Sequence, residues 1–221
     1  VTCITHRKNA VYPATIVGIP PQEDAWIGLA TERIFLHPIK MTMLPELIDM
    51  HMPAEGVFHN IVIVKIKKTF AGQGNKVINS LWGAGQMMFN KIMIVADDEV
   101  NIHDYNAVAR TVSENVMPAE HAAIVKGPLD VLDHSSRKMG YGSKLGIDAS
   151  NKYEEEVLSE KRIQQAIIIK KNEIIEKFPE IGSLNNSLCK KGFSIIIISL
   201  NKNQKNHISL VNTRLVEEGF I

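Results

Sequence analysis

Apolar and polar residues alternate along the chain with two different periods. Unbroken apolar runs are typical of strands covered on both faces, and they occur at Ile61–Val64 within VFHNIVIVKI (57–66) and in KIMIVAD (91–97). Between them, apolar residues recur at helical spacing, at Val77, Ile78, Leu81, Trp82, Gly85, Met88 and Phe89. Strands that alternate with helices predict βαβ units. We therefore expect an α/β fold, with a mainly parallel sheet and helices on both faces.

Other elements fit the same scheme. Pro20 and Pro21 end a β-rich stretch, and the acidic residues that follow favour the first turn of a helix. The predicted buried face of this helix is formed by Trp26, Leu29, Ala30 and Ile34. The stretch ELIDMHMP (46–53) reads as a strand, and Ala122–Val125 as a short one. Asn101 is a candidate N-cap for a helix with the inner face Tyr105, Val108, Ala109, Val112 and Val116.

Both ends of the chain resemble interrupted elements. The chain opens at Val1 with VTCITHR, which reads as a strand, and AVYPATIVGIPP (10–21) is also β-rich. It stops at EEGFI, directly after a predicted helix. We therefore expect the sequence to be a piece of a longer protein.

The composition changes after residue 152. Glu154–Lys177 reads as a charged helix with a narrow apolar set, consisting of Val157, Leu158, Ile163, Ala166 and Ile167. The tail GFSIIIISLNKNQKNHISLVNTRLVEEG then aligns by eye with GVFHNIVIVKIKKTFAGQGNKVINSLWGAG. We interpret the tail as the start of a second copy of the same strand–helix unit, with a shorter connecting loop.

The composition excludes several classes of protein. The chain has 221 residues, of which 45% are hydrophobic and 22% charged, so it can form a globular core and is not disordered. Its net charge of +1 gives no electrostatic argument for binding nucleic acid or an anionic membrane. No apolar run has the length of a membrane-spanning helix. With no signal peptide visible, we expect the cytoplasm as the compartment.

Cysteine and histidine spacing does not indicate a metal site. Cys3 and Cys189 lie far apart without a CxxC pair. None of the eight histidines forms an HxH or HxxxH pair. A GxSxG elbow is also absent from the sequence, which removes the usual signature of a serine hydrolase.

The stretch GYGSKLGIDASNK (140–152) invites comparison with a phosphate-binding loop. A Walker A loop ends in Gly-Lys-Ser/Thr, but here Lys144 follows Ser143 and precedes Leu145. We therefore interpret the stretch as an ordered loop with a structural or interface role. Its glycines, at 140, 142 and 146, predict either positive φ angles or close approach to a neighbouring segment.

Two further stretches each allow two interpretations, and one further lysine allows one. Asp97-Asp98-Glu99 follow a predicted parallel strand and either bind a hard cation or form a solvated turn. Gly72-Gln73-Gly74 precede a helix and either bind an anion or form a flexible turn. Lys91 starts a predicted strand, and its position in the pattern indicates a surface lysine.

Four stretches together resemble one enzyme family. They are YPATIVGIPPQEDAWIG, LPELIDMHMPAEGVFHNIVIVKIKK, FNKIMIVADDEVNIHDYNAV and GSKLGIDASNK. In this order they resemble the C-terminal part of UbiD-type decarboxylases, the 3-polyprenyl-4-hydroxybenzoate carboxy-lyases of quinone biosynthesis. The resemblance covers residues 1–152. Residues 153–221 fit a longer subtype with an extra α/β unit, such as those of menaquinone-type pathways.

The resemblance implies a domain organisation. Residues 1–21 correspond to the last strands of the family's central flavin-binding barrel, and residues 22–152 to its C-terminal α/β domain. Residues 153–221 then form the charged helix and the start of an extra βα unit. The helix that begins at Glu23 and the loop at His134 are implied to face the substrate.

The resemblance also implies a reaction. This is non-oxidative decarboxylation of an aromatic or α,β-unsaturated acid with prenylated FMN, whose phosphate is bridged to the protein by a divalent metal. The family's catalytic arginine, its two acids and its metal ligands lie upstream of the position matching Val1, so we expect this chain alone to be inactive and to bind no cofactor. One site residue carries over, since Lys91 matches the lysine of a Phe-x-Lys-x-x-Ile-Val stretch near the cofactor phosphate.

The expected partners are an upstream barrel domain of the same protein, a small aromatic acid and further copies of the chain. The alternative interpretation is a non-catalytic α/β oligomerisation module. A free-standing nucleotide-binding protein has no phosphate-binding motif to support it.

Overall fold

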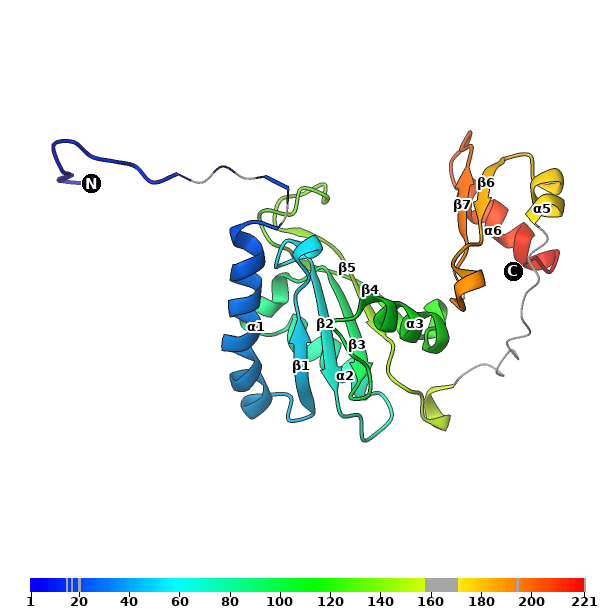
Figure 1. The fold of residues 1–221 in the computed structure, drawn as a ribbon, viewed down its shortest axis with the longest axis horizontal. Coiled ribbons are helices and arrows are strands. Elements are labelled where there is room, and N and C mark those ends of the chain that lie inside the picture. Colours follow the sequence, from blue (N-terminus) through cyan, green and yellow to red (C-terminus); the bar gives the residue numbers. More distant parts are fainter. Residues whose placement is uncertain (15, 17, 20, 158–170, 194, 221) are drawn as a thin grey trace.

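The structure is a computed structural model that describes residues 1–14, 16, 18–19, 21–157, 171–193 and 195–220. Figure 1 shows a five-stranded sheet with helices against it and a smaller two-stranded sheet. The order in the larger sheet is β1-β2-β3-β5-β4. Its strands are β1 (Leu47–His51), β2 (Ile61–Ile66), β3 (Ile92–Asp97), β4 (Ala122–Pro128) and β5 (Tyr141–Asp148). The three central strands β2, β3 and β5 are parallel, whereas the edge strands β1 and β4 pair antiparallel to their neighbours.

Helices cover both faces of this sheet, as predicted. They are α1 (Glu23–Thr42), α2 (Gln73–Trp82), α3 (Tyr105–Asn115) and the short α4 (Pro118–His121). Val62 and Val64 of β2 join the core formed with α2, whereas Ile63 between them joins the core that contains Val108 of α3. Because alternate residues of a strand face opposite sides, both neighbouring cores require apolar residues from β2. This explains the unbroken apolar run.

Short 3₁₀ helices join several of these elements. They are η1 (Ala54–Gly56), η2 (Gly85–Phe89), η3 (Glu154–Glu156) and η4 (Cys189–Lys191). After η1, Val57 and Phe58 have φ angles of 50° and 49°. Strand β2 therefore begins at Ile61 rather than at the start of VFHNIVIVKI, because a left-handed backbone cannot continue a strand.

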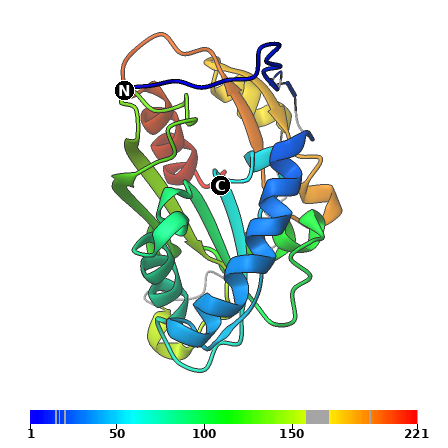
Figure 2. The same cartoon turned by 90° about the vertical axis from the view of Figure 1, so that its left-hand side faces the viewer.

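The predicted buried face of α1 is wrong. Trp26 is 72% exposed and Ile34 is 64% exposed, whereas Gly28, Glu32 and Ile39 are buried. The helix packs along the edge strand β1 and contacts η1, so only a narrow stripe of it is covered. Figure 2 looks onto α1 and shows no helix or strand in front of it.

The predicted loop at residues 140–152 is also wrong over most of its length, because Tyr141–Asp148 forms strand β5 between β3 and β4. Of its glycines, only Gly140 has a positive φ, at 68°. Gly146 is required for close packing, since a Cβ there would lie 2.7 Å from Cγ2 of Ile78 on α2. Gly142 is similarly crowded by Ser136 and Leu129.

The N-cap of α3 is Asp104 rather than Asn101. The Asp104 side chain accepts a hydrogen bond of 2.9 Å from the backbone N–H of Asn106. Asn101 instead accepts from the N–H of His103, which closes a turn ahead of the helix.

The segment before α1 forms no strand in the part that the structure describes. Residues 1–14 run as an extended arm away from the sheet (Figure 1). A strand requires a neighbour to satisfy its backbone N–H and C=O groups, and none lies beside this arm. The predicted strands VTCITHR and AVYPATIVGIPP are therefore not formed among the described residues.

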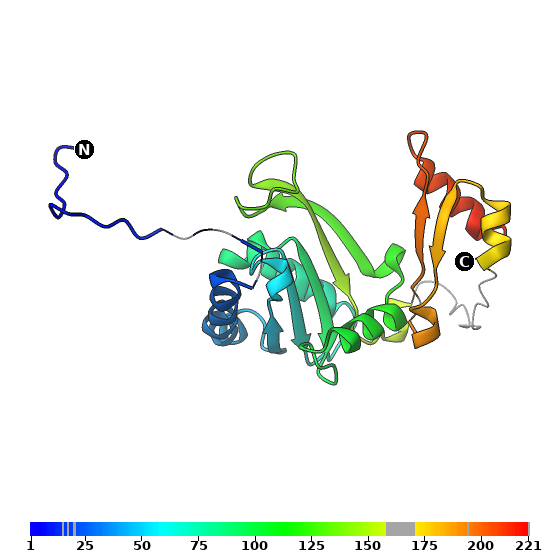
Figure 3. The same cartoon turned by 45° about the horizontal axis from the view of Figure 1, so that its top comes forward.

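The C-terminal unit has a core of its own. It contains α5 (Lys171–Lys177), the antiparallel strands β6 (Ile181–Asn185) and β7 (Ile197–Leu200), and α6 (His207–Glu217). Its buried residues are Ile174, Phe178, Ile181, Leu184, Val211 and Leu215. Figure 3 shows this unit standing beside the larger sheet rather than extending it.

In the described parts of the predicted charged helix at Glu154–Lys177, the structure forms η3 and α5. The central residues of the predicted helix, including Leu158, Ile163, Ala166 and Ile167, lie outside the described part. The predicted second strand–helix unit is β7–α6. Its connecting loop is not shorter than that of β2–α2, because both loops contain six residues, 67–72 and 201–206.

Candidate functional site

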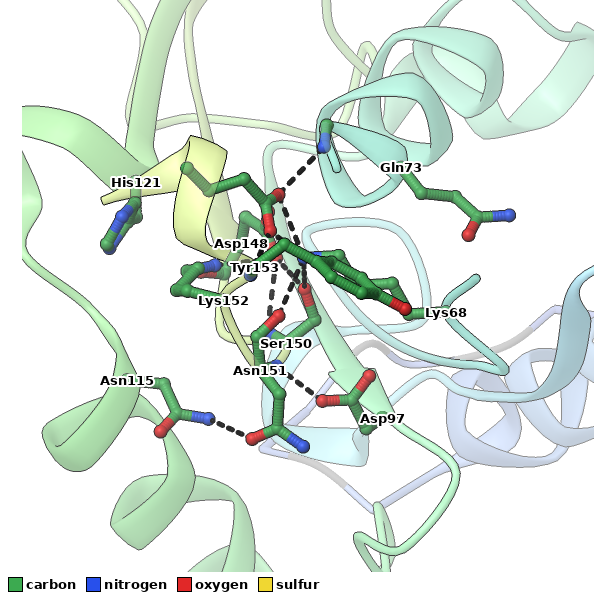
Figure 4. A network of polar contacts seen from close by, with 12 residues as sticks. Lys68, Gln73, Asp97, Asn115, His121, Asp148, Ser150, Asn151, Lys152 and Tyr153 are labelled. Atoms are coloured by element: carbon green, nitrogen blue, oxygen red, sulfur yellow. Dashed lines mark hydrogen bonds and ion pairs between the residues drawn. The ribbon is translucent and has the colours of Figure 1, made fainter. Parts of the chain in front are cut away.

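A cluster of charged residues lies where β3 and β5 end, beside the start of α2 (Figure 4). We call it the strand-end cluster, and its members are Lys68, Asp97, Asp148, Lys152 and Glu156. The carboxyl ends of parallel strands are where ligands usually bind in α/β sheets. The cluster is therefore a candidate functional site.

Lys68 is the centre of this cluster. Its Nζ lies 2.6 and 2.8 Å from the two carboxylate oxygens of Glu156. It also donates to the carbonyl of Asn151 at 2.7 Å and to Ser150 Oγ at 3.1 Å. The Lys68 side chain is only 3% exposed, so these contacts are shielded from solvent.

The N-terminus of α2 is occupied by carboxylates of the same chain. Gly72, with φ 78°, caps the helix, and its N–H donates to Glu156 Oε1 at 2.8 Å. A Cβ at Gly74 would lie 2.3 Å from Cγ of Asp148, so only glycine fits beside that side chain. The backbone of Gly72 thus binds an anion of the same chain, the carboxylate of Glu156, and the side chain of Asp148 packs against Gly74.

Asp97 is buried, and its carboxylate accepts from the backbone N–H of Asn151. Burial raises its pKa above the ordinary value, and the nearby charge of Asp148 adds to this effect. Asp148 in turn lies 3.1 Å from Nζ of Lys152, whose pKa is lowered by burial. Among the described residues no group of three potential ligands is arranged to hold a metal ion, so Asp97-Asp98-Glu99 do not form a metal site there.

The strand-end cluster is thus a closed network. Its carboxylates are bound by lysines and backbone N–H groups of this chain, and it fastens residues 149–156 to the sheet. The sequence did not indicate Lys68 and Glu156, because they are 88 residues apart.

Lys91 lies at the other end of the sheet, directly before β3. Its Nζ is 2.6 Å from Asp133 Oδ2 and 3.2 Å from Ser136 Oγ, and it also donates to Ser135 Oγ. Its side chain is 22% exposed, so it is not the free surface lysine that the pattern indicated. Burial acts to raise the pKa of Asp133, but hydrogen bonds from Lys91 and Ser135 outweigh it and lower this pKa to about 2.

Lys91 can bind a phosphate only by giving up one of its present contacts. Its three N–H donors face Asp133, Ser135 and Ser136. A phosphate oxygen therefore has to replace one of these acceptors, and Ser136 makes the longest contact. A lysine with two hydroxyl groups beside it suits a phosphate, provided that the loop after β4 moves to release one donor.

The other two positions implied to face substrate are exposed. His134 lies in the same loop as Asp133, and Glu23 forms the first turn of α1. The structure brings neither of them to Lys91 through a hydrogen bond or ion pair among the described residues.

Lys144 is a buried lysine that the sequence pattern did not reveal, since its stretch was interpreted as a loop. It is 2% exposed, donates to the carbonyl of Met88 and lies 5.1 Å from the ring centroid of Trp82. No carboxylate pairs with it among the described residues. Burial lowers its pKa to about 8. The strand register of β5 places Lys144, Gly146 and Asp148 on one face, towards α2.

A second group of titratable side chains lies beside β1. His51 Nδ1 is 3.0 Å from Oε1 of the buried Glu32, and the ring of His103 lies 4.5 Å from that of His51. Tyr105 donates a hydrogen bond of 3.1 Å to Glu55. Burial raises the pKa of Tyr105, and this hydrogen bond raises it further. These groups tie α1 and the loop before α3 to the sheet edge.

Comparison with known proteins places the chain in context. A family model described as the 3-octaprenyl-4-hydroxybenzoate carboxy-lyase C-terminal domain matches residues 25–149. An uncharacterized protein of Archaeoglobus fulgidus is 49% identical over 157 residues, which cover 71% of this chain and 32% of the relative. An uncharacterized protein of Aquifex aeolicus is 49% identical over 156 residues, with the same coverage. The chain thus spans about a third of the length of these relatives.

Solved structures show the same fold. The closed form of vanillic acid decarboxylase from Sedimentibacter hydroxybenzoicus has a TM-score of 0.60 and 26% identity, covering 80% of this chain and 37% of that one. The UbiD-class enzyme HmfF from Pelotomaculum thermopropionicum, in complex with FMN, has a TM-score of 0.52 and 26% identity, covering 62% and 31%.

Proposed function

The chain belongs to the 3-octaprenyl-4-hydroxybenzoate carboxy-lyase (UbiD) family through its C-terminal domain. On this basis we propose that it is the C-terminal domain of a non-oxidative decarboxylase that acts on aromatic or α,β-unsaturated acids. The family match over residues 25–149 is the observation that carries the proposal. The similarity to a vanillic acid decarboxylase supports an aromatic acid as substrate. Within this class, the proposed substrate is a 3-polyprenyl-4-hydroxybenzoate-type acid of quinone biosynthesis, and the proposed compartment is the cytoplasm.

The proposed cofactor is prenylated FMN, bound to the parent protein together with a divalent metal. When bound, this cofactor supplies the electron sink for loss of CO2. Lys91 is the proposed contact of this chain with the cofactor phosphate, through one of the N–H groups that now faces Ser136 or its neighbours. The ion pair with Asp133 holds the lysine in place.

The chain is proposed to be inactive alone. The arginine, the two acids and the metal ligands implied by the family resemblance are proposed to lie upstream of the position that matches Val1. The proposed contribution of this chain is the sheet that carries Lys91 and the loop at residues 129–140. The chain covers 32% of each of the two relatives that are 49% identical to it, which leaves ample length for the remaining groups.

The exposed side of α1 is the proposed contact with the upstream barrel domain. Trp26, Ile27 and Ile34 are 72%, 47% and 64% exposed, although large apolar residues normally lose most of their exposure. Residues 1–21, which the family resemblance assigns to that barrel, join directly to this helix. The same surface favours a second candidate function, a non-catalytic oligomerisation module, and further copies of the chain remain proposed partners.

A domain exchange tests the proposal. Residues 25–149 replace the matching segment of the Archaeoglobus fulgidus relative, and FMN binding and CO2 release are measured. We expect the chimera to bind FMN as its host does and the chain alone to bind none. The oligomerisation module would be favoured instead if light scattering shows that the isolated chain forms an oligomer and if the chimera folds but does not bind FMN.

A further inference from the structure

The C-terminal unit contains a sheet of only two strands, so each strand has one edge without a neighbouring strand. Strand β6 pairs antiparallel with β7, and neither pairs with a further strand in the part of the chain that the structure describes. Figures 1 and 3 show β7 on the side of this pair that lies away from α5. The outward backbone N–H and C=O groups of such an edge can pair with another strand.

The other strand edges of the described sheets are protected. Proteins protect an edge with charged side chains, proline, a bulge or a covering helix. Strand β1 contacts α1, and its pairing with β2 contains a register shift. Strand β4 contains the exposed Lys126 and ends at Pro128. Strand β6 contacts α5 and has a register shift at Gly182.

Strand β7 has none of these features. Its four residues, Ile197, Ile198, Ser199 and Leu200, include no charged residue, no proline and no glycine. The extra residue of the register shift lies on β6 and not on β7. An uncharged strand rich in isoleucine pairs readily with a further strand. The outer edge of β7 is therefore suited to bind a partner strand.

The two faces of β7 differ in their surroundings. Ile198 and Leu200 pack against the core that contains Val211 and Leu215 of α6. Because side chains alternate along a strand, Ile197 lies on the opposite face, where it is 56% exposed. Strand β7 thus presents an exposed apolar side chain beside its free edge, and cross-strand apolar pairs stabilise a sheet.

A second copy of this chain is the partner that removes the free edge without creating another. Two β7 strands that pair antiparallel about a twofold axis form a four-stranded sheet in the order β6-β7-β7-β6. The outer edges of this sheet are then the two β6 strands, which carry the register shift at Gly182. A strand of a different protein would instead add its own far edge to the sheet.

The charge pattern also favours a copy of the same strand. Since β7 contains no charged residue, no like charges lie directly opposite each other within the paired strands. Lys202 follows the end of the strand. Antiparallel pairing places the Lys202 residues of the two copies at opposite ends of the ladder, so their charges do not face each other.

We propose that the free edge of β7 is a homodimerisation surface, at which two copies of the chain form one continuous four-stranded sheet. Backbone hydrogen bonds between the two β7 strands hold the dimer together, and Ile197 of each copy adds apolar contact on the exposed face. The surface lies outside residues 25–149, so this proposal goes beyond the decarboxylase function and does not depend on it. It is also distinct from an assembly through the exposed side of α1.

Sedimentation velocity of the 221-residue chain over a range of concentrations tests the proposal. We expect a reversible equilibrium between monomer and dimer. Ile197→Lys places a charge beside the pairing edge of each copy and is expected to raise the dissociation constant of the dimer at least tenfold. Ile124→Lys is the matched control, because Ile124 is a 75% exposed isoleucine on the edge strand β4 of the other sheet. This variant and Trp26→Lys on α1 are expected to leave the dissociation constant unchanged.

Hydrogen exchange followed by NMR gives a second measurement, which needs no variant. The amides of residues 197–200 that do not pair with β6 should exchange at least tenfold more slowly above the dissociation constant than below it, because pairing with the second copy protects them. The amides of β4 should exchange equally at both concentrations. This measurement decides the question if Ile197→Lys does not fold, which circular dichroism of the variant reports.

Four results would each overturn the proposal. The chain could remain a monomer up to millimolar concentration, or the dimer could have the same dissociation constant in Ile197→Lys as in Ile124→Lys. The β7 amides could exchange equally above and below the dissociation constant. Loss of the dimer in Trp26→Lys but not in Ile197→Lys would place the contact on α1 instead.

Discussion

Nζ of Lys68 lies 2.6 Å from Oε2 of Glu156, across 88 residues of sequence. This ion pair closes the strand-end cluster and holds η3 against the start of α2 (Figure 4). Because Lys68 is 3% and Glu156 11% exposed, water cannot replace either partner without opening the structure.

Glu156→Gln is expected to destabilise the chain by about 3 kcal/mol, because it leaves the buried charge of Lys68 without its partner. This corresponds to a fall in Tm of about 6–12 °C in a chain of this size. Thermal unfolding followed by circular dichroism measures it. The exposed neighbour Glu155, changed to glutamine, is the matched control and should shift Tm little. Equal Tm values for the two variants would show that the ion pair does not stabilise the fold.

The same pair predicts a pH dependence. Burial acts to raise the pKa of Glu156, but hydrogen bonds from Lys68 and Gly72 outweigh it and lower this pKa below its ordinary value of 4.5. A carboxyl group with a lowered folded-state pKa stabilises the fold above its unfolded pKa, and this contribution is lost as the pH falls below 4.5. The difference in Tm between the native chain and Glu156→Gln should therefore shrink between pH 5 and pH 3. A constant difference over that range would contradict the assignment.

Lys144→Met is expected to stabilise the chain at pH 7. Burial lowers the pKa of Lys144 to about 8 from 10.5, so a charged Lys144 costs up to about 3 kcal/mol below pH 8. The unfolded state binds the extra proton between pH 8 and 10.5, so the stability of the native chain should rise over this range. Urea unfolding at pH 7 and pH 10 checks both effects. Lys126→Met, an exposed lysine on β4, is the control and should change neither value. A large loss of stability in Lys144→Met at pH 7 would instead show that its contacts to Met88 and Trp82 outweigh burial.

Lys91→Met is expected to weaken FMN binding by the chimera about tenfold to a hundredfold, since one charge-assisted hydrogen bond is removed. Flavin fluorescence titration measures the Kd. Lys126→Met again serves as the matched control. If both variants bind FMN with the affinity of the unmodified chimera, Lys91 does not contact the phosphate.

Trp26 reports whether α1 is covered in the parent protein. In Trp82→Phe, Trp26 is the remaining tryptophan and should be strongly quenched by acrylamide in the isolated chain, because it is 72% exposed. The chimera is then made with Trp82→Phe and with phenylalanine in place of the host's own tryptophans, so that Trp26 is again its one tryptophan. Acrylamide quenching of Trp26 should be several-fold weaker in this chimera than in the isolated chain, because the upstream domain covers α1. Unchanged quenching would place the upstream domain elsewhere.

Strands β1 to β4 could be predicted from the sequence, but the central strand β5 could not. Strands β2 and β3 are apolar on both faces because α2 and α3 lie on opposite sides, and this leaves a clear pattern. Strand β5 contains Gly142, Gly146 and the buried polar residues Lys144 and Asp148, so it resembles a loop. The glycine at 146 is explained only by Ile78 and Trp82 of α2, which approach it in space.

The helix α1 illustrates a different limit. Its helical spacing was correctly recognised, but apolar spacing does not say which partner covers it. Trp26 and Ile34 are exposed, and no described residue covers them. Lys91 shows the same limit for a polar residue, since its partner Asp133 is 42 residues away and follows β4.

Release of labelled CO2 from carboxyl-labelled aromatic acids distinguishes a decarboxylase domain from a non-catalytic module. The chimera, its Archaeoglobus fulgidus host and the isolated chain are each supplied with prenylated FMN and divalent metal. We expect release by the host and the folded chimera, and none by the isolated chain. A folded chimera that loses the activity of its host, or release by the chain alone, would contradict this expectation.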